Sequence, residues 1–465
     1  MPALMLRNNK TRRQQQERIK KHVENIEHHA FINILTSPEL STIIESSLPE
    51  YRQRLYCPTG TLSMFLTQAL NEDSSCQKAV NDYAINKVTS ESLSIATSTS
   101  AYCQARKRLP LPLVINLARE TGALIQRQTP NDWHWKNKTV YLLDGTTISM
   151  PDTAENQQAY PQPSTQAEGV GFPISRLVCA ISLASGAIIN ASMAAYSGKN
   201  TGEQSLLREQ LDTFSAGDVV LGDAIYGTYF LLASLINKGV DAVFEQMGGR
   251  KTDFRKGTRL GARDHIVELS KPKNKPDWMA QDQYDSTRDT LLIRELRVGG
   301  KCLITTFLSP KDVSKKDLKS LYKGRWNVEL DLRNIKTTMG MDVLSCKTPE
   351  MIEKEIWVYF LAYNLIRLLM AQSALLANIQ PREISFKHAL QLWLSWCYRG
   401  ISLNEEAVDL LFTLISQNRV GRRPGRIEPR AVKRRPKPFL RLTSPRNIAR
   451  VEIKKNGHSK KINSA

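Results

Sequence analysis

The chain has 465 residues, of which 41% are hydrophobic, so it can bury a large core and form one large domain with additions or two to three domains. Its formal net charge of +20 indicates a polyanionic partner, most often nucleic acid. The seven cysteines include no CxxC pair and the seven histidines form no HxxxH cluster, which argues against a Cys/His zinc site and agrees with a reducing cytosol.

We expect no segment of the chain to enter a membrane. The basic start, residues 1–23, lacks the apolar region of a signal peptide. The most apolar run, "IWVYFLAYNLIRLLM", is interrupted by Arg367, follows Glu355 and is short for a membrane span. It is therefore predicted to be a core helix.

Residues 1–135 are predicted to be a helical N-terminal region. The runs "TGTLSMFLTQALNE" and "PLPLVINLARETGALIQRQ" carry apolar residues at helical spacing, and Pro110 and Pro112 punctuate the sequence between them. The basic run Arg106–Arg108 precedes these prolines. Two interpretations stay open for this region: a module that binds DNA ends, and a plain helical lid on the core.

Residues 136–247 are predicted to alternate between strands and helices. "KTVYLLDGTTISM" is a short β-rich run broken by Asp-Gly, and "SRLVCAISLASGAIINASMAA" indicates a hairpin. A helix ("NTGEQSLLREQLDTF"), a short buried strand ("DVVLGDAIYG"), a helix ending at Gly239 and a last strand ("DAVFEQM") follow. This order is typical of a mixed sheet with helices on its faces, in an α/β fold.

The second half of the chain divides into four predicted parts. Residues 248–310 contain extended runs and a Gly-Gly turn, which favour a β-rich insertion. Residues 311–345 contain a helix that completes the core, and residues 346–418 contain helices at about 350–377, 385–398 and 404–418. The tail, residues 419–465, is rich in Pro and Arg; we expect it to be irregular and ordered on DNA. From residue 417 onward, 16 Lys and Arg face two Glu, which places +14 of the +20 charge here.

The stretch "LYKGRWNVELDLRNIKTTMG", residues 321–340, places a polar line beside an apolar stripe. At about 100° per residue the apolar stripe lies on one arc of a single helix. Four polar residues fall on a second arc about 80° away, whereas Asp331 points elsewhere. The stripe is Leu321, Val328, Leu332, Ile335 and Met339, and the polar line is Tyr322, Arg325, Glu329 and Lys336. An ordinary amphipathic helix with surface ion pairs remains the alternative interpretation.

Two aspartates add weight to a functional interpretation of Glu329. Asp144 and Asp223 are each predicted to end a strand, where sites form in open α/β sheets. The three carboxylates could bind two hard cations, Mg²⁺ or Mn²⁺, and two such ions serve the attacking and the leaving oxygen of an in-line phosphoryl displacement. Taken singly, either aspartate could instead be a common turn residue.

These residues resemble the insertion-sequence-four family of DDE transposases. The spacing Tyr-x2-Arg-x3-Glu-x6-Lys, which begins at Tyr322, is similar to the signature of that family. Asp144-Gly-Thr resembles its first motif, and "GDAIYG", with Asp223 and Tyr226, resembles its second. The tail "RAVKRRPKPFLRL" is similar to its basic endings, and the resemblance spans about residues 97–446.

The resemblance implies an RNase H-like catalytic core with a β-rich insertion between the second aspartate and the glutamate. It implies cut-and-paste transposition: nicking, hairpin formation and opening, and strand transfer. Asp144, Asp223 and Glu329 would then be metal ligands, while Tyr322, Arg325 and Lys336 contact DNA phosphates; the last two suit bidentate and point-charge contacts. The implied partners are double-stranded DNA (terminal inverted repeats and target) and a second copy of the chain in a homodimer that pairs two ends. The implied location is the cytoplasm of a bacterium, on the nucleoid.

Three positions need separate comment. The family often has a basic residue after its second aspartate, where this chain has Ala224, which implies a weaker phosphate contact or a subgroup difference. The family also stacks an aromatic side chain on a flipped base, and Trp278 is a candidate by its location, although a packing or surface role is the stronger interpretation. Trp326 is predicted to be a packing residue.

Other functions remain open from the residues alone. A metal-dependent DNA nuclease without strand transfer would need the same carboxylates. An inactive or domesticated DNA-binding descendant is disfavoured, because all three carboxylates are present. A basic RNA- or ribosome-binding protein would leave the three-carboxylate pattern unexplained.

Overall fold

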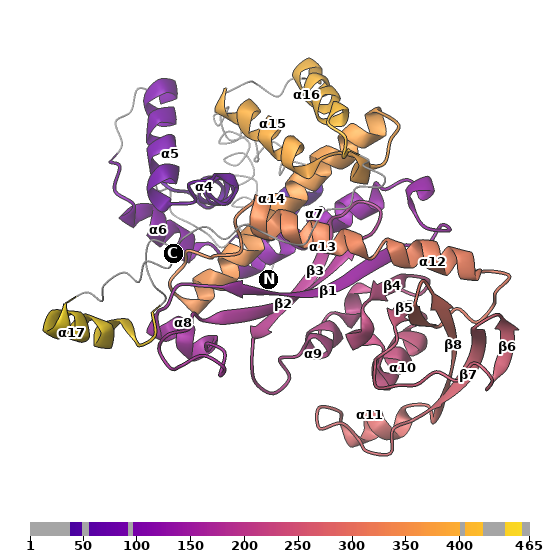
Figure 1. The fold of residues 1–465 in the computed structure, drawn as a ribbon. Coiled ribbons are helices and arrows are strands. Elements are labelled where there is room, and N and C mark those ends of the chain that lie inside the picture. The colour runs from indigo at the N-terminus through magenta and orange to yellow at the C-terminus, as the bar shows by residue number, and fades with distance from the viewer. Residues whose placement is uncertain (1–37, 49–54, 92–95, 400–404, 422–441, 458–465) are drawn as a thin grey trace, which may run out of the picture.

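A nine-stranded mixed sheet runs through the middle of the protein in the computed structural model, which describes residues 38–48, 55–91, 96–399, 405–421 and 442–457. The strands lie in the order β3-β2-β1-β4-β5-β9-β8-β7-β6 (Figure 1). They are β1 (Val140–Ser149), β2 (Ile174–Ser182), β3 (Ile188–Ala195), β4 (Val219–Gly222), β5 (Asp241–Glu245), β6 (Thr258–Gly261), β7 (Asp264–Ser270), β8 (Thr290–Val298) and β9 (Lys301–Thr305). Strand β4 pairs in parallel with β1 and β5, and all other neighbours are antiparallel. The expectation of a mixed α/β sheet is confirmed.

Glycines at left-handed positions close the predicted turns. Strands β2 and β3 form the expected hairpin, in which Gly186 has a φ of 77°. The turn between β8 and β9 places Gly299 and Gly300 at φ of 55° and 86°, where side chains with a Cβ are strained. Helix α10 (Tyr229–Lys238) ends at Gly239, with φ of 73°, at the residue the sequence indicates.

The segment 248–310 continues the same sheet. Its last strand, β9, pairs with β5, and β8, β7 and β6 follow outward in turn. A short helix, α11 (Gln281–Ser286), lies between β7 and β8. The β-rich segment is therefore joined to the parallel strands by backbone hydrogen bonds.

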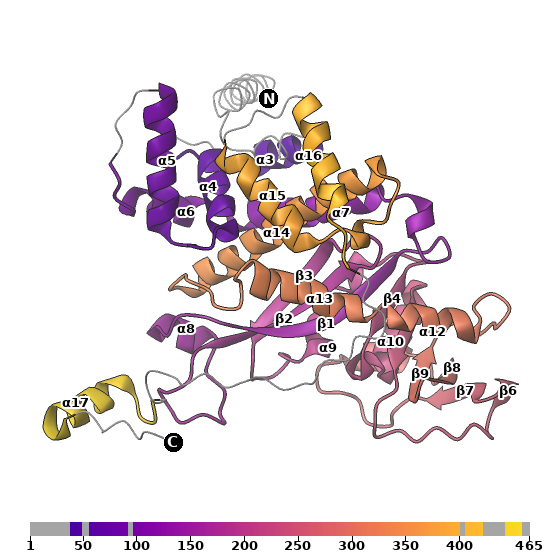
Figure 2. The same ribbon diagram turned by 45° about the horizontal axis from the view of Figure 1, so that its top comes forward.

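Helices cover both faces of the sheet (Figures 1 and 2). On β1, Leu142 and Ile148 belong to one apolar cluster with α7 and α14, whereas Tyr141 and Leu143 belong to another with α10. The first face carries α7 (Leu111–Arg127), α13 (Trp326–Arg333) and α14 (Pro349–Leu376), and the second carries α9 (Glu203–Arg208) and α10. Successive side chains of β1 thus point alternately into two separate apolar cores, one on each face of the sheet.

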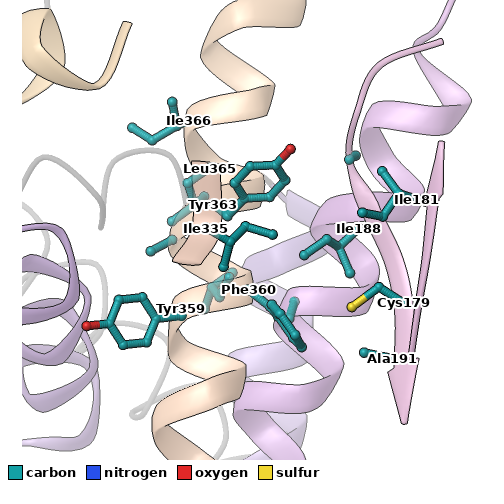
Figure 3. Packing of buried hydrophobic residues seen from close by; sticks show 14 of the residues in the cluster. Cys179, Ile181, Ile188, Ala191, Ile335, Tyr359, Phe360, Tyr363, Leu365 and Ile366 are labelled. Atoms are coloured by element: carbon teal, nitrogen blue, oxygen red, sulfur yellow. The ribbon is translucent and has the colours of Figure 1, made fainter. Parts of the chain in front are cut away.

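Helix α14 is the centre of the larger core. Its side chains pack against β2, β3 and the end of the Glu329 segment, as Phe360 and Ile335 show in Figure 3. Asn364 donates to the carbonyl oxygens of Ala118 (2.9 Å) and Ile188 (2.8 Å), which joins α14 to α7 and β3. Among the described residues this is the one helix with the length and composition to cross a membrane, but 89% of its most apolar window is buried inside the protein. It is the core helix that the sequence predicts.

The remaining helices come from the two ends of the described chain, and most of them add buried side chains to the larger core. The N-terminal ones are α3 (Pro38–Ser47), α4 (Pro58–Leu70), α5 (Cys76–Glu91) and α6 (Ser100–Arg108), and the C-terminal ones are α15 (Phe386–Tyr398) and α16 (Glu405–Gln417). The prediction that the whole tail is irregular is wrong, because Arg446–Asn456 form a helix, α17, with no buried residue. Its apolar Ile448 and Val451 are exposed, and it stands away from the body in both views. Most of "RAVKRRPKPFLRL" lies outside the described residues.

Candidate active site

The two aspartates lie side by side on neighbouring parallel strands. Leu142 of β1 pairs with Leu221 of β4, so continuing this register by two residues places Asp144 beside Asp223. Asp223 follows the last residue of β4, as predicted, and its carboxylate accepts a hydrogen bond from the backbone N–H of Ile225 at 3.0 Å. This bond fixes the short turn that follows the strand.

Asp144 does not end its strand, contrary to our prediction. Strand β1 continues to Ser149 because its other edge stays paired with β2, with Asp144 opposite Cys179. The pairing with β4 stops earlier, at Gly222. Asp144 therefore lies where the sheet becomes open on one side only, which leaves its carboxylate half-buried.

The surroundings of Asp144 disfavour its charge. The pKa of its carboxyl group is raised to about 6, mainly by burial, and the carboxylates Glu203 and Asp223 contribute to this rise. The backbone N–H of Gly145, at 3.0 Å, and the guanidinium of Arg325 act in the opposite direction. A bound divalent cation would reverse the balance, since it favours the ionised carboxylate.

The single helix predicted within residues 311–345 consists of three segments. Helix α12 (Lys315–Lys323) ends at Gly324, α13 follows, and a π-helical turn (Asn334–Thr338) completes the run. At the break the N–H groups of Gly324 and Arg325 bond to carbonyls three residues earlier, which tightens the chain. Glycine favours this break because it is the weakest helix former after proline.

The polar line nevertheless lies along the open edge of the sheet. Tyr322 donates to Glu245 Oε2 at 3.0 Å, and Arg325 donates to Glu329 Oε1 at 2.9 Å. Lys336 donates to Thr146 Oγ1 at 3.1 Å and to the carbonyl of Thr147 at 2.8 Å, both on β1. Burial raises the pKa of Tyr322, and the neighbouring Glu245 adds to this effect. All four side chains of the line therefore have partners within the protein.

Glu329 reaches the aspartates through Arg325. The Glu329 side chain is 39% exposed and that of Arg325 is 12% exposed. Arg325 also interacts electrostatically with Asp144, so its guanidinium attracts both the Glu329 carboxylate and the Asp144 carboxylate. In the part of the chain that the structure describes, no three His, Cys, Asp or Glu are grouped closely enough to hold a metal ion. Asp144 and Asp223 are neighbouring oxygen donors of the type that hard cations prefer, whereas Glu329 is paired with Arg325.

The two tryptophans differ from each other in exposure. Trp278 packs perpendicular to Phe230, with ring centroids 6.2 Å apart, and the guanidinium of Arg208 lies 3.7 Å from its ring centre. Trp326 is 58% exposed, so the prediction that it is a packing residue is wrong. The break before α13 turns Trp326 outward, beside Arg325.

Sequence reasoning missed two acidic side chains at this site. Glu245 ends β5, and the pairing of Gly222 with Phe244 places Glu245 in line with Asp223. Sites form at strand ends in open α/β sheets, and this expectation, which indicated Asp223, also applies to Glu245. Glu203, the first residue of α9, contacts the β1 segment from the opposite face, and no motif signals it.

The chain matches known transposases. Residues 135–365 match the family described as "Transposase DDE domain". The chain is 28% identical over 347 residues to the transposase InsG for insertion sequence element IS4 of Escherichia coli K12, covering 72% of this chain and 77% of InsG. It is 30% identical over 145 residues to the putative transposase InsZ of the same organism, covering 30% of this chain and 46% of InsZ. A solved piggyBac transposase synaptic complex with hairpin DNA aligns with a TM-score of 0.40 and 9% identity over 83% of this chain and 82% of that one.

The matched segment contains Asp144, Asp223 and Glu329 together with the whole sheet, and it defines an enzyme of the DDE-domain class. Within that class, the chain belongs to the insertion-sequence-four family of DDE transposases, the family that its motifs resemble. Enzymes of this class use divalent metal ions.

Proposed function

We propose that this transposase moves its own insertion sequence by cutting double-stranded DNA at the terminal inverted repeats and joining the freed ends to target DNA. One observation carries the proposal. Asp144 and Asp223 lie in register at an open sheet edge, and Tyr322, Arg325 and Lys336 lie along the same edge. Two carboxylates that can bind cations thus lie next to basic and hydroxyl side chains that can bind DNA phosphates.

Asp144, Asp223 and Glu329 would hold two Mg²⁺ ions, for which Mn²⁺ can substitute. When bound, these ions polarise the attacking water or 3′-hydroxyl and stabilise the leaving oxygen. Arg325, on release from Glu329, is placed to donate two hydrogen bonds to a DNA phosphate. Lys336 adds a second positive charge close to Thr146, and Tyr322 a hydroxyl donor beside Glu245. Release of Glu329 to the cations and of Arg325 to the phosphate would therefore occur together.

The strand order supports an RNase H-like core. The sequence β3-β2-β1-β4-β5, with β2 antiparallel to its neighbours and β1, β4 and β5 parallel, places the first aspartate on the central strand. Residues 136–247 with 311–345 would form this core, and 248–310 the insertion that extends its sheet. Residues 1–135 and 346–418 would flank it, with 419–465 as the basic tail.

We also propose that two copies pair the two DNA ends as a homodimer, using the apolar helices of residues 346–418. Exposed Leu375 and Leu376 at the end of α14 and Leu410 on α16 are apolar groups that such contacts would cover. The expected location is the bacterial cytoplasm, on the nucleoid. Trp278 remains a proposed base-stacking residue, although Arg208 covers its ring in the absence of DNA.

A cleavage assay tests the proposal. The purified protein is mixed with DNA that carries the flanks of its own gene, in Mg²⁺ or EDTA, beside Glu329→Gln and, as a control, Glu209→Gln, an exposed glutamate at the end of α9. The proposal expects nicks and hairpins at the ends from the wild type and the control, in Mg²⁺ alone. Equal cutting by Glu329→Gln would remove Glu329 from the site. Cleavage without joining to target DNA would favour a nuclease, and binding without cleavage an inactive descendant.

A further inference from the structure

Lys301, the first residue of β9, lies beside the open edge of the sheet that carries the two aspartates. Strand β9 runs antiparallel to β5 with Leu303 opposite Glu245, so Lys301 lies two residues beyond the end of β5. Asp223 is in line with Glu245 at this same end of the parallel strands. The hairpin of β8 and β9 therefore carries Lys301 past the edge at which the candidate active site lies.

Lys301 also points to the same face of the sheet as the aspartates. Side chains two positions apart on a strand share a face, and Leu303 is buried in the larger core, on the face that α13 covers. Asp144 and Asp223 each follow, by two positions, a strand residue that is buried in this same core. The ammonium group is thus directed to the side of the sheet on which the other candidate DNA contacts lie.

Glu245 holds the Lys301 ammonium next to Tyr322. Lys301 Nζ donates to Glu245 Oε2 at 2.6 Å, and the Tyr322 hydroxyl donates to the same oxygen at 3.0 Å. Lys301 Nζ also lies 5.8 Å from the centre of the Tyr322 ring. The single hydroxyl proton of Tyr322 is therefore used within the protein. Among the described residues Glu245 is the only hydrogen-bond partner of the ammonium, so two of its three N–H donors remain for a ligand.

The space around Lys301 is open. Its side chain is 49% exposed, whereas that of Arg325 at the same edge is 12% exposed. Within the described structure, a Cβ atom built on Gly299 or Gly300, in the turn before Lys301, would meet no heavy atom within 4 Å apart from its chain neighbours. An exposed lysine–glutamate pair contributes little to stability, and the Gly-Gly turn shapes the hairpin without it. The hairpin thus leaves room for a phosphate backbone beside the ammonium.

We propose that Lys301 is a further DNA-phosphate contact of the active site, with its ammonium donating to Glu245 and to the phosphate together. The inference rests on the proposed function, because it takes transposon-end DNA to lie at this edge. Two strand spacings, about 10 Å, separate β9 from β4, so the phosphate bound by Lys301 is a neighbour of the one that is cut. Lys336 lies on the opposite side, at β1, and the two lysines would hold the DNA strand on either side of the cleavage point.

Binding of DNA by the full-length protein tests the inference. Fluorescence anisotropy is measured with a duplex that carries the flanks of the protein's own gene, in EDTA so that no strand is cut. Lys301→Gln should weaken binding about fivefold, the effect of one exposed charge pair. Lys301→Arg keeps the charge and should bind as the wild type does. Lys273→Gln is the matched control, since it changes an exposed lysine beyond the opposite end of β8, and it should also bind normally.

Duplexes with one neutral methylphosphonate locate the contact. Each duplex carries the uncharged group at a single position near the cleavage point. At the phosphate that Lys301 binds, the wild type should lose affinity and Lys301→Gln should lose no more, so that both proteins bind this duplex equally. We expect that position beside the cleaved phosphate and not at it.

The outcomes separate the inference from the proposed function. Normal binding by Lys301→Gln, together with cutting of the ends by the wild type in Mg²⁺, would overturn the inference and leave the proposed function intact. A loss that persists on every methylphosphonate duplex would also overturn it, because Lys301 would then act without contacting a phosphate near the cleavage point. Failure of the wild type to cut the end duplex or to prefer it over unrelated DNA would instead overturn the proposed function.

Discussion

Asp331 and Arg367 form a fully buried ion pair between α13 and α14, two residues after Glu329. Arg382 donates a second set of hydrogen bonds to the same carboxylate, with 2.9 Å between its NH2 and Oδ2. The segment that carries Glu329 is thus held to the core from its buried side. Glu329 and Asp331 therefore point in different directions from α13, as the sequence predicts for Asp331.

Asp331→Asn should therefore destabilise the protein strongly, because it leaves two arginines without their buried counter-charge. We expect the free energy of unfolding to fall by about 3–5 kcal/mol, measured by urea denaturation. Glu329→Gln, the matched control, breaks only a partly exposed pair and should cost less than about 1 kcal/mol. Similar losses in the two variants would contradict the assigned roles.

The raised pKa of Asp144 predicts a pH dependence of stability in EDTA. Its pKa is about 6 in the folded protein and near 3.8 when unfolded, so the folded state binds more protons between these values. The stability that this proton contributes is fully present below about pH 4 and is lost as the pH rises through 6, about 3 kcal/mol in all. The wild type should thus lose stability relative to Asp144→Asn between pH 5 and pH 7. Thermal unfolding of both proteins checks this, and a difference that is constant with pH would refute it.

Added Mg²⁺ or Mn²⁺ should reverse this loss at pH 7. The cation favours the ionised carboxylate and binds the folded state, so Tm should rise with metal concentration in the wild type. The shift should be much smaller in Asp144→Asn. An equal shift in both proteins would place the stabilising metal elsewhere.

The two tryptophans should respond differently to truncation. Trp278→Ala removes packing on Phe230 and the contact with Arg208, so we expect a loss of about 1–3 kcal/mol in the free energy of unfolding. Trp326→Ala removes a largely exposed side chain and should change stability by less than about 0.5 kcal/mol. Denaturation of the two variants side by side tests this. If Trp278→Ala leaves the free energy of unfolding unchanged, Trp278 is not a packing residue.

DNA binding should depend steeply on salt, and α17 should carry part of that dependence. Each phosphate neutralised by a basic side chain contributes about −0.9 to the slope of log affinity against log salt concentration. Replacing the four basic residues of α17 by Gln should make the slope shallower by up to about 4, without loss of stability, because the helix buries no residue. These residues are Arg446, Arg450, Lys454 and Lys455. An unchanged slope in fluorescence-anisotropy titrations would exclude α17 as a DNA contact.

Sequence patterns predicted those elements whose position depends on the local preferences of their own residues. The hairpins, the helix that ends at Gly239 and the long helices after residue 349 lie where periodicity and turn residues place them. Asp223 follows its strand as predicted, because a buried run of four residues ends there. The α/β class follows from this order of elements.

The remaining features depend on contacts between distant segments. Strand β1 continues past Asp144 because β2 pairs with it, and a strand's partner is not visible in its own residues. The break at Gly324 and the π-helical turn divide a run whose apolar spacing favours one helix. Glu203 gains its place from the room beside Gly145, a contact across 58 positions of sequence that no spacing encodes.

The pairing of β9 with β5 has a consequence for attempts to shorten this protein. Excision of residues 248–310 would remove not only a surface appendage but also the strand that satisfies the outer backbone groups of β5. The apolar Val243 and Phe244 would then lie on a bare edge, which offers a template for pairing between chains. A minimal version built by such trimming should form aggregates in the test tube, whereas one that retains β8 and β9 as a closing hairpin should remain dispersed.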